Sequence, residues 1–297
     1  QALATTLVSV GAISTHPTSS YPGGSSEAPE ITPDGRFIAF TSTATNLVPG
    51  GRLAGDVYVR DLVAGTNAWA SAGMRSVLQS ALGKTNGLCY DLALSDDGKF
   101  VAFQACPTPT TSGVYTGIVL RVGLETGLTD VVHTNAPVSV AAAGDTRNLA
   151  MTPDGAFIAF AANSNSASGL ATCIRVWDAA SGTSTLASGN VTNAVTTGSL
   201  SSRPVIDPTG CYVAFLSSAP ALVTNTVSGN WHVYVRDLVA ANTTLVDTDT
   251  NGTGGLVTEV TVPAFSADGR FVAYESADAS LVPADNMIAS RPQVVSP

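Results

Sequence analysis

The chain has 297 residues, of which 44% are hydrophobic and only 12% are charged. No stretch approaches the ~20 unbroken apolar residues of a membrane-spanning helix, so we expect no membrane span. The formal net charge of −9 argues against a nucleic-acid partner, because binding to phosphate backbones needs a clustered basic surface. Abundant Ser, Thr, Ala, Gly and Val are typical of many short strands joined by tight turns.

The chain starts at Gln1 without an initiator Met or a basic, apolar leader. Cleavage of a secretory signal leaves such a start, as does trimming of the chain. We therefore expect a secreted or periplasmic protein. The low charge density leaves a second possibility open, in which the chain is a subunit of a larger assembly.

Five segments of the chain repeat one pattern, in which a turn precedes an alternating apolar stretch. They are ITPDGRFIAF at 31–40, LSDDGKFVAF at 94–103, MTPDGAFIAF at 151–160, IDPTGCYVAF at 206–215 and FSADGRFVAY at 265–274. The Asp-Gly pair is a turn signal, and the alternation after it has the period of a strand. Each copy therefore predicts a β-hairpin.

Third and fourth strands follow most hairpins, as in DVYVRDL at 56–62 and TTLVDT at 243–248. Four antiparallel strands per repeat predict an all-β fold, a single five-bladed β-propeller. The last repeat lacks a fourth strand, which the N-terminal strand 4–11 would supply to close the ring. The predicted blades lie approximately at 27–72, 89–134, 146–190, 202–249 and 260–297 plus strand 4–11.

The segments PDGRFIAF, NLVPGG and DVYVRDL resemble the WD40-like repeat of TolB-type β-propellers. This resemblance covers nearly the whole chain and implies a propeller in a bacterial periplasmic or extracellular setting. It implies little about activity, because such propellers serve as binding platforms or as accessory domains of enzymes. The fourth copy departs from the pattern, with Thr209-Gly210 in place of Asp-Gly.

The first strand of each blade would line a central channel, and its early residues would surround one mouth. The polar residues at these positions are Glu27, Glu30, Asp91, Arg147 and Arg203. They predict a site for a polar ligand or ion, or else carboxylates and guanidinium groups that neutralise one another around a wet channel. Glu27, Glu30 and Asp91 also keep open a glycoside hydrolase, which needs paired carboxylates.

Other chemistry finds little support in the sequence. We expect the turn aspartates to cap local N–H groups rather than bind metal, and we expect no metal and no cofactor. The histidines His16, His133 and His232 stand in unrelated contexts, as surface residues would, and no GxSxG nucleophile motif is present.

One cysteine pair predicts a disulfide. A turn centred between Asp97 and Gly98 places Cys89 opposite Cys106 across the hairpin, where a bond would suit an oxidising compartment. Two buried free thiols are the alternative. Cys173 and Cys211 would lie at opposite faces, and we expect no bond between them.

Three long connections remain as recognition candidates, at 12–26, 73–87 and 219–231. We therefore expect a non-catalytic platform that binds a protein or glycan through exposed loops. A carbohydrate-active enzyme that uses the channel carboxylates is the competing hypothesis.

Overall fold

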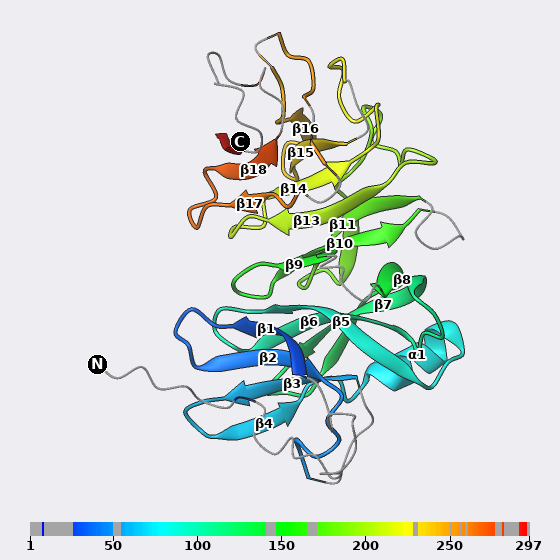
Figure 1. Ribbon diagram of the computed structural model, residues 1–297, viewed down its shortest axis with the longest axis vertical. Helices are drawn as coiled ribbons and strands as arrows, with labels where there is room; N and C mark the ends of the chain where they lie inside the picture. Colours follow the sequence, from blue (N-terminus) through cyan, green and yellow to red (C-terminus); the bar gives the residue numbers. More distant parts are fainter. Residues whose placement is uncertain are drawn as a thin grey trace. The chain divides into compact units, whose positions relative to one another are not determined.

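The computed structural model describes residues 8, 26–49, 55–140, 147–164, 171–227, 231–249, 251–255, 257–258, 261–276, 281 and 291–295 (Figure 1). In this part of the chain each of the five repeats forms its own antiparallel sheet. The chain groups into two compact units. Unit 1 contains residues 1–111, 117–134 and 153–155, and unit 2 contains residues 112–116, 135–152 and 156–297.

Unit 1 is built on two four-stranded sheets in which neighbouring strands follow chain order. Sheet 1 consists of β1 (Ser26–Ile31), β2 (Phe37–Ser42), β3 (Asp56–Asp61) and β4 (Thr66–Trp69). Sheet 2 consists of β5 (Gly87–Leu94), β6 (Phe100–Pro107), β7 (Gly113–Gly123) and β8 (Thr129–Val140), with the outer ends of β7 and β8 grouped in unit 2. The helix α1 (Met74–Leu82) lies between the two sheets in sequence.

Unit 2 contains the other three sheets. Sheet 3 consists of β9 (Leu149–Met151), β10 (Phe157–Asn163), β11 (Thr172–Asp178) and β12 (Thr183–Leu186). Sheet 4 consists of β13 (Ser201–Ile206), β14 (Tyr212–Ser217), β15 (His232–Asp237) and β16 (Asn242–Leu245). Sheet 5 has three strands among the described residues, β17 (Ala264–Phe265), β18 (Val272–Ser276) and β19 (Arg291–Val295).

The predicted arrangement of four antiparallel strands per repeat is confirmed for sheets 1 to 4. The strand predicted at residues 4–11 lies outside the described residues, except for Val8. Ring closure by this strand therefore stays a prediction. The part of the chain that the structure describes has no helix long and apolar enough to cross a bilayer.

The core consists of apolar faces of neighbouring sheets packed on one another. In unit 1, Ala39 and Val59 of sheet 1 belong to one buried cluster with Phe103 and Leu120 of sheet 2. In unit 2, buried clusters join sheet 3 to sheet 4 and sheet 4 to sheet 5. Successive side chains of a strand point to opposite faces, and strands such as β10 and β14 carry buried apolar residues at consecutive positions, so both faces of these sheets are apolar.

The two ends of each sheet differ in how the strands are connected. At one end, which we call the tight-turn end, short turns join the first strand to the second and the third to the fourth, as at 32–36 and 62–65. At the opposite end, the long-connection end, the remaining segments join the second strand to the third and each sheet to the next, and most of them are longer, as at 70–86. Antiparallel order alone dictates this separation, so any recognition loops gather at one end.

The turn glycines also join neighbouring sheets. A Cβ atom on Gly98 would lie 2.2 Å from the ring of Phe37, and one on Gly210 would lie 2.4 Å from Phe157. Gly155 makes the same approach to Phe100. In these three contacts the Gly of one repeat accommodates the aromatic ring of the repeat before it, and its positive φ supplies the turn, whereas Gly269 of the fifth repeat lies against Asp207.

Candidate functional site

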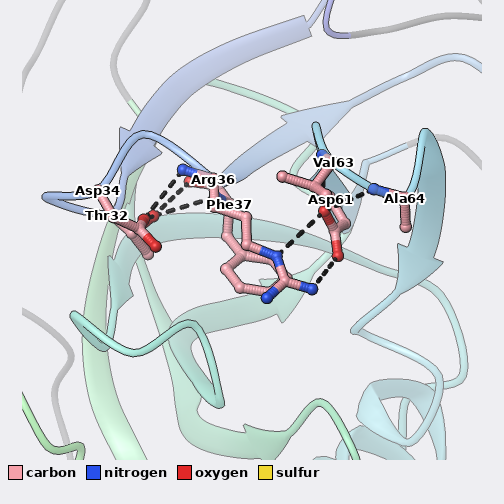
Figure 2. A network of polar contacts seen from close by, with 7 residues as sticks. All are labelled: Thr32, Asp34, Arg36, Phe37, Asp61, Val63 and Ala64. Carbon is pink, nitrogen blue, oxygen red and sulfur yellow. Dashed lines mark hydrogen bonds and ion pairs between the residues drawn. The ribbon is translucent and has the colours of Figure 1, made fainter.

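The tight-turn end is organised by hydroxyl–carboxylate pairs. Figure 2 shows Thr32, whose hydroxyl donates to Asp34 Oδ1 at 2.6 Å and accepts the Phe37 N–H at 3.0 Å. The same Asp34 oxygen accepts the Arg36 N–H at 3.0 Å. Ser95–Asp97 and Ser266–Asp268 repeat these bonds in sheets 2 and 5. The predicted capping role of these aspartates is confirmed.

Sheet 4, where Thr209 replaces the turn Asp, keeps a similar network of three bonds with exchanged partners. The Thr209 N–H donates to Asp207 Oδ2, in place of the bond from the Arg36 N–H to Asp34. Here Asp207 stands at the hydroxyl position, and Asp207 Oδ1 accepts the Tyr212 N–H at 2.7 Å. The Thr209 hydroxyl donates to Asp207 Oδ2. The departure at Thr209 is therefore compensated two residues earlier and costs the turn no hydrogen bond.

The third strands end on a second set of capping carboxylates. Asp61 Oδ1 accepts the N–H groups of Val63 and Ala64, and Asp61 Oδ2 lies 2.8 Å from Arg36 Nη2 (Figure 2). The bond from Arg36 lowers the pKa of Asp61 to about 2, and the bond from Thr32 lowers the pKa of Asp34. Asp237 caps the corresponding turn of sheet 4. These carboxylates are engaged in fold-building bonds.

Strained bulges lie near the start of the first strands, where the sequence predicts the channel mouth. The register shifts between Glu27 and Glu30 in sheet 1, and equivalent shifts occur in sheets 2 and 4. The bulged residues Ala28, Asp91 and Arg203 have φ values of 51°, 44° and 52°. A left-handed conformation costs a residue with a Cβ roughly 1 kcal/mol, so its recurrence indicates that the backbone here is set by the repeat.

The five predicted mouth residues fall into two groups by unit. Glu27 and Glu30 are exposed on β1, and Asp91 is half-buried at the bulge of β5, all in unit 1. Arg147 and Arg203 belong to unit 2, where the Arg203 N–H donates to Asn148 Oδ1 of the neighbouring repeat at 3.3 Å. The structure thus gathers the acidic members in one unit and the basic members in the other, and a shared channel stays a prediction.

The bulge in β5 makes the predicted facing of Cys89 and Cys106 wrong. From the turn back to Leu92 the register matches the sequence-based pairing. From Tyr90 to the start of β5 the register is shifted by one residue. Cys89 then pairs with Ala105, and Cys106 pairs with Leu88, so the two thiols point to opposite faces. Both are buried and free, and burial raises the pKa of Cys106 to about 12.

His232 is not a surface residue, contrary to the sequence-based expectation. It is 2% exposed, and its Nδ1 lies 2.9 Å from Asp247 Oδ2. Asp247 is fully buried, which raises its pKa, while the bond with His232 opposes that shift. Asp247 Oδ1 also accepts the Val233 N–H at 3.1 Å. The pair therefore fixes the start of β15 to the segment that directly follows β16.

Ser217, His232 and Asp247 have the residue types of a nucleophilic triad but not its accessibility. Ser217 lies opposite His232 across the strand pair. Its hydroxyl is bonded to the Ser201 hydroxyl at 2.9 Å, and Ser217 has no exposed surface. A nucleophile must meet its substrate, so this buried row is structural.

A segment that the sequence reasoning missed has calcium-like spacing. DTDTNG at 247–252 follows the first half of an EF-hand loop. However, Asp247 points to His232, and Asp249 Oδ1 accepts the N–H groups of Asn251 and Thr253. Asn190, a neutral amide, builds the same turn in the preceding repeat. The spacing is therefore explained by turn geometry.

Two of the three predicted recognition loops are anchored in the core. The segment 73–87 contains α1, whose Met74 and Leu78 are fully buried. The segment 219–231 buries Leu222 and Val223 between sheets 3 and 4. The segment 12–26 lies outside the described residues apart from Ser26. Helical spacing of Met74 and Leu78 was the signal in the sequence for the first of these anchors.

The solved structures that the chain is similar to include TolB-like and other β-propeller proteins. A putative TolB from Agrobacterium tumefaciens is 18% identical, with a TM-score of 0.47 over 92% of this chain and 78% of that chain. The β-propeller domain of the Trilobed protease from Pyrococcus furiosus is 11% identical, with a TM-score of 0.48 over 92% and 69%. A prolyl endopeptidase is 12% identical, with a TM-score of 0.47 over 85% of this chain and 32% of that chain, so the chain spans about a third of that protein. No protein-family model and no curated protein matches the chain.

Proposed function

We propose that the chain is a secreted or periplasmic five-bladed β-propeller that acts as a non-catalytic platform for a protein or glycan. The observation that carries this proposal is the difference between the two ends of the sheets. Carboxylates at the tight-turn end are engaged in turn bonds, whereas the long-connection end holds segments anchored by residues such as Met74 and Leu222. Anchored loops on a rigid scaffold are suited to recognition.

The contact between turn glycines and aromatic rings supports a closed ring. Phe37, Phe100 and Phe157 each lie against the Gly of the following repeat. The series is interrupted at Gly269, which lies against Asp207 of the repeat before it. At the first and last repeats, Gly35 has open space around its Cβ position, and Phe271 is 40% exposed. Closure would bring this unmatched ring and this unmatched glycine together.

Val8 supports the N-terminal strand as the closing element. It packs against the buried cluster that contains Ile38, Phe40 and Tyr58, on the face of sheet 1 opposite the cluster shared with sheet 2. In a closed five-bladed ring that face meets the last blade, and the outermost strand of the last blade is the one that residues 4–11 would form.

The substitution Phe271→Ala tests closure. In a closed ring the ring of Phe271 is buried, and its loss should lower the free energy of unfolding by about 3 kcal/mol. Val63→Ala, at a position 78% exposed, is the control and should change it by less than about 0.5 kcal/mol. Equal, small effects in urea denaturation would contradict closure.

The binding function is tested against glycoside hydrolysis, its main competitor. Glu30→Gln and Asp91→Asn variants and the unmodified protein are assayed for reducing-end release from a panel of polysaccharides. The proposal expects no release by any of them. Hydrolysis by the unmodified protein that both variants lose would replace the platform with an enzyme.

Membership of a larger extracellular assembly is a variant of the same proposal, suggested by the charged fraction of 12%. Light scattering over a hundred-fold range of concentration measures it directly. A mass that grows with concentration supports the assembly, and a constant monomer mass at the highest concentration contradicts it.

A further inference from the structure

Three connections at the long-connection end of unit 2 are tied into one surface. They are the described residues of 187–200, 218–227 and 246–255, which we call the joined surface. The Val191 N–H donates to Ala221 O at 3.0 Å, and the Gly254 N–H donates to Thr226 O at 3.0 Å. Asn225 Nδ2 adds a bond to Gly252 O at 3.1 Å. The three segments therefore hold one another in place.

Buried residues of sheet 4 also hold the joined surface in place. Gly254 lies so close to His232 that an added Cβ would be 2.8 Å from the imidazole Cε1. The buried Arg236 donates from Nη2 to Asn193 Oδ1 at 2.9 Å. With Leu222 and Val223 in the core, the surface is preorganised, so a ligand would meet little of the ordering cost that weakens binding to mobile loops.

Most side chains that the joined surface exposes are uncharged and polar, beside the apolar Val191, Ala194 and Pro220. The uncharged polar ones are Thr192, Asn193, Thr197, Thr224, Asn225, Thr226 and Asn251. Among the described residues of the three segments the only ionisable side chains are those of Asp247, which is buried, and Asp249, which is bonded within its own turn. Such a surface offers no cation to an acidic ligand, and its one partly exposed carboxylate, Asp249, is already engaged in turn bonds.

We infer that the joined surface binds an uncharged glycan, which deepens the proposed function and rests on it. Threonine hydroxyls and asparagine amides both donate and accept hydrogen bonds, as sugar hydroxyls do. A protein partner fits less well, because protein interfaces centre on buried aromatic or Arg anchors. Among the described residues of the joined surface, Val191 is the one exposed large apolar side chain, and no aromatic or Arg side chain is exposed there.

Affinity gel electrophoresis in gels containing dextran, mannan or xyloglucan tests this inference, with the anionic polysaccharide alginate as comparison. Thr197→Ala/Thr224→Ala removes two exposed hydroxyls of the joined surface and leaves the turn bonds of Asn190 in place. Thr66→Ala/Thr185→Ala removes two exposed hydroxyls on the outer strands β4 and β12 and is the matched control. We expect retardation by at least one neutral polysaccharide, weakened about five-fold in the first variant and unchanged in the control.

Each other outcome overturns a separate statement. Retardation that is equal in all three proteins places the glycan elsewhere and overturns the joined surface, but leaves the platform function standing. Retardation by alginate alone, or by none of the polysaccharides, overturns the uncharged glycan as partner. Release of sugar from the gel matrix contradicts the platform function itself.

Discussion

Sheets 1 and 4 build two similar networks in which the acid occupies opposite members of a pair of chain positions. In the first turn, Thr32 and Asp34 of sheet 1 correspond to Asp207 and Thr209 of sheet 4. At the long-connection end, the Ser71 hydroxyl donates to Asp56 at 2.6 Å in sheet 1. In sheet 4, His232 takes the position of Asp56 and Asp247 takes the position of Ser71, and these two side chains are again bonded. Ser71 also accepts the Val57 N–H, and Asp247 likewise accepts the Val233 N–H.

The exchange shows which part of the repeat is fixed and which part is free. The backbone brings the two paired positions within hydrogen-bond distance, and either of the two positions can carry the acid. What differs is the surroundings of the acid. Asp56 has a second partner in Arg75 of α1 at 2.8 Å, and Arg75 reaches solvent, whereas both His232 and Asp247 are buried. Sheet 4 therefore depends more strongly on its pair.

The largest effect should come from breaking the two buried acids. Asp247→Ala leaves buried N–H groups of His232 and Val233 without an acceptor, and we expect a loss of about 3 kcal/mol in the free energy of unfolding. Asp56→Ala should cost about 2 kcal/mol, because Arg75 can turn to water and Ser71 still accepts the Val57 N–H. Urea denaturation of both variants measures the difference.

Asp247→Asn separates the hydrogen bonds from the charge. It keeps an acceptor for the Val233 N–H and should recover part of the stability lost in Asp247→Ala. If Asp56→Ala proves the more costly of the two alanine variants, the greater dependence of sheet 4 on its pair is wrong.

Exchange of the turn partners should give the next effect. In sheet 4, Asp207→Thr and Thr209→Asp should each cost about 1–2 kcal/mol, because the first removes the only acid of the pair and the second sets two acids together. The double variant restores the arrangement of sheet 1 and should lie within about 1 kcal/mol of the unmodified protein. The reciprocal pair Thr32→Asp and Asp34→Thr in sheet 1 is the matched cycle. Additive losses in either cycle would contradict interchangeable roles.

A smaller effect is expected at the bulges, which sheets 1 and 4 share. Ala28→Gly relieves the left-handed strain without removing a functional side chain, and we expect a gain of about 0.5 kcal/mol after the greater chain entropy of Gly is counted. Ala68→Gly on the outer strand β4 is the control and should lose about 0.5 kcal/mol. Equal losses in thermal unfolding would show that φ at Ala28 carries no strain.

The sequence predicts the hairpins, the capping aspartates and the four-strand repeat, because turn chemistry and alternation are local properties. It fails at the bulges, since Ala28, Asp91 and Arg203 share no side-chain preference for a left-handed backbone, and the misplaced register of Cys89 follows from one of them. The partnership of His232 with Asp247 was equally hidden, because cross-strand contacts depend on register. Comparison of equivalent positions between repeats, Asp56 with His232 and Ser71 with Asp247, was the one signal that could have exposed it.

The smallest difference between the two sheets should appear in acid. Arg36 lowers the pKa of Asp61 from 3.8 to about 2, so folding is favoured by this carboxylate above pH ~4, and the contribution is lost as the pH falls toward ~2. In sheet 4, Cys211 stands where sheet 1 has Arg36. Asp237 corresponds to Asp61 and accepts the same two turn bonds, from the N–H groups of Val239 and Ala240. Asp61→Asn should therefore flatten the fall of the melting temperature between pH 4 and 2. Arg36→Gln removes the ion pair, leaves the turn bonds of Asp61 in place and should flatten the fall part of the way. If Arg36→Gln leaves the fall as steep as it is in the unmodified protein, the acid sensitivity belongs to the turn bonds of Asp61, and the ion pair with Arg36 adds nothing to it.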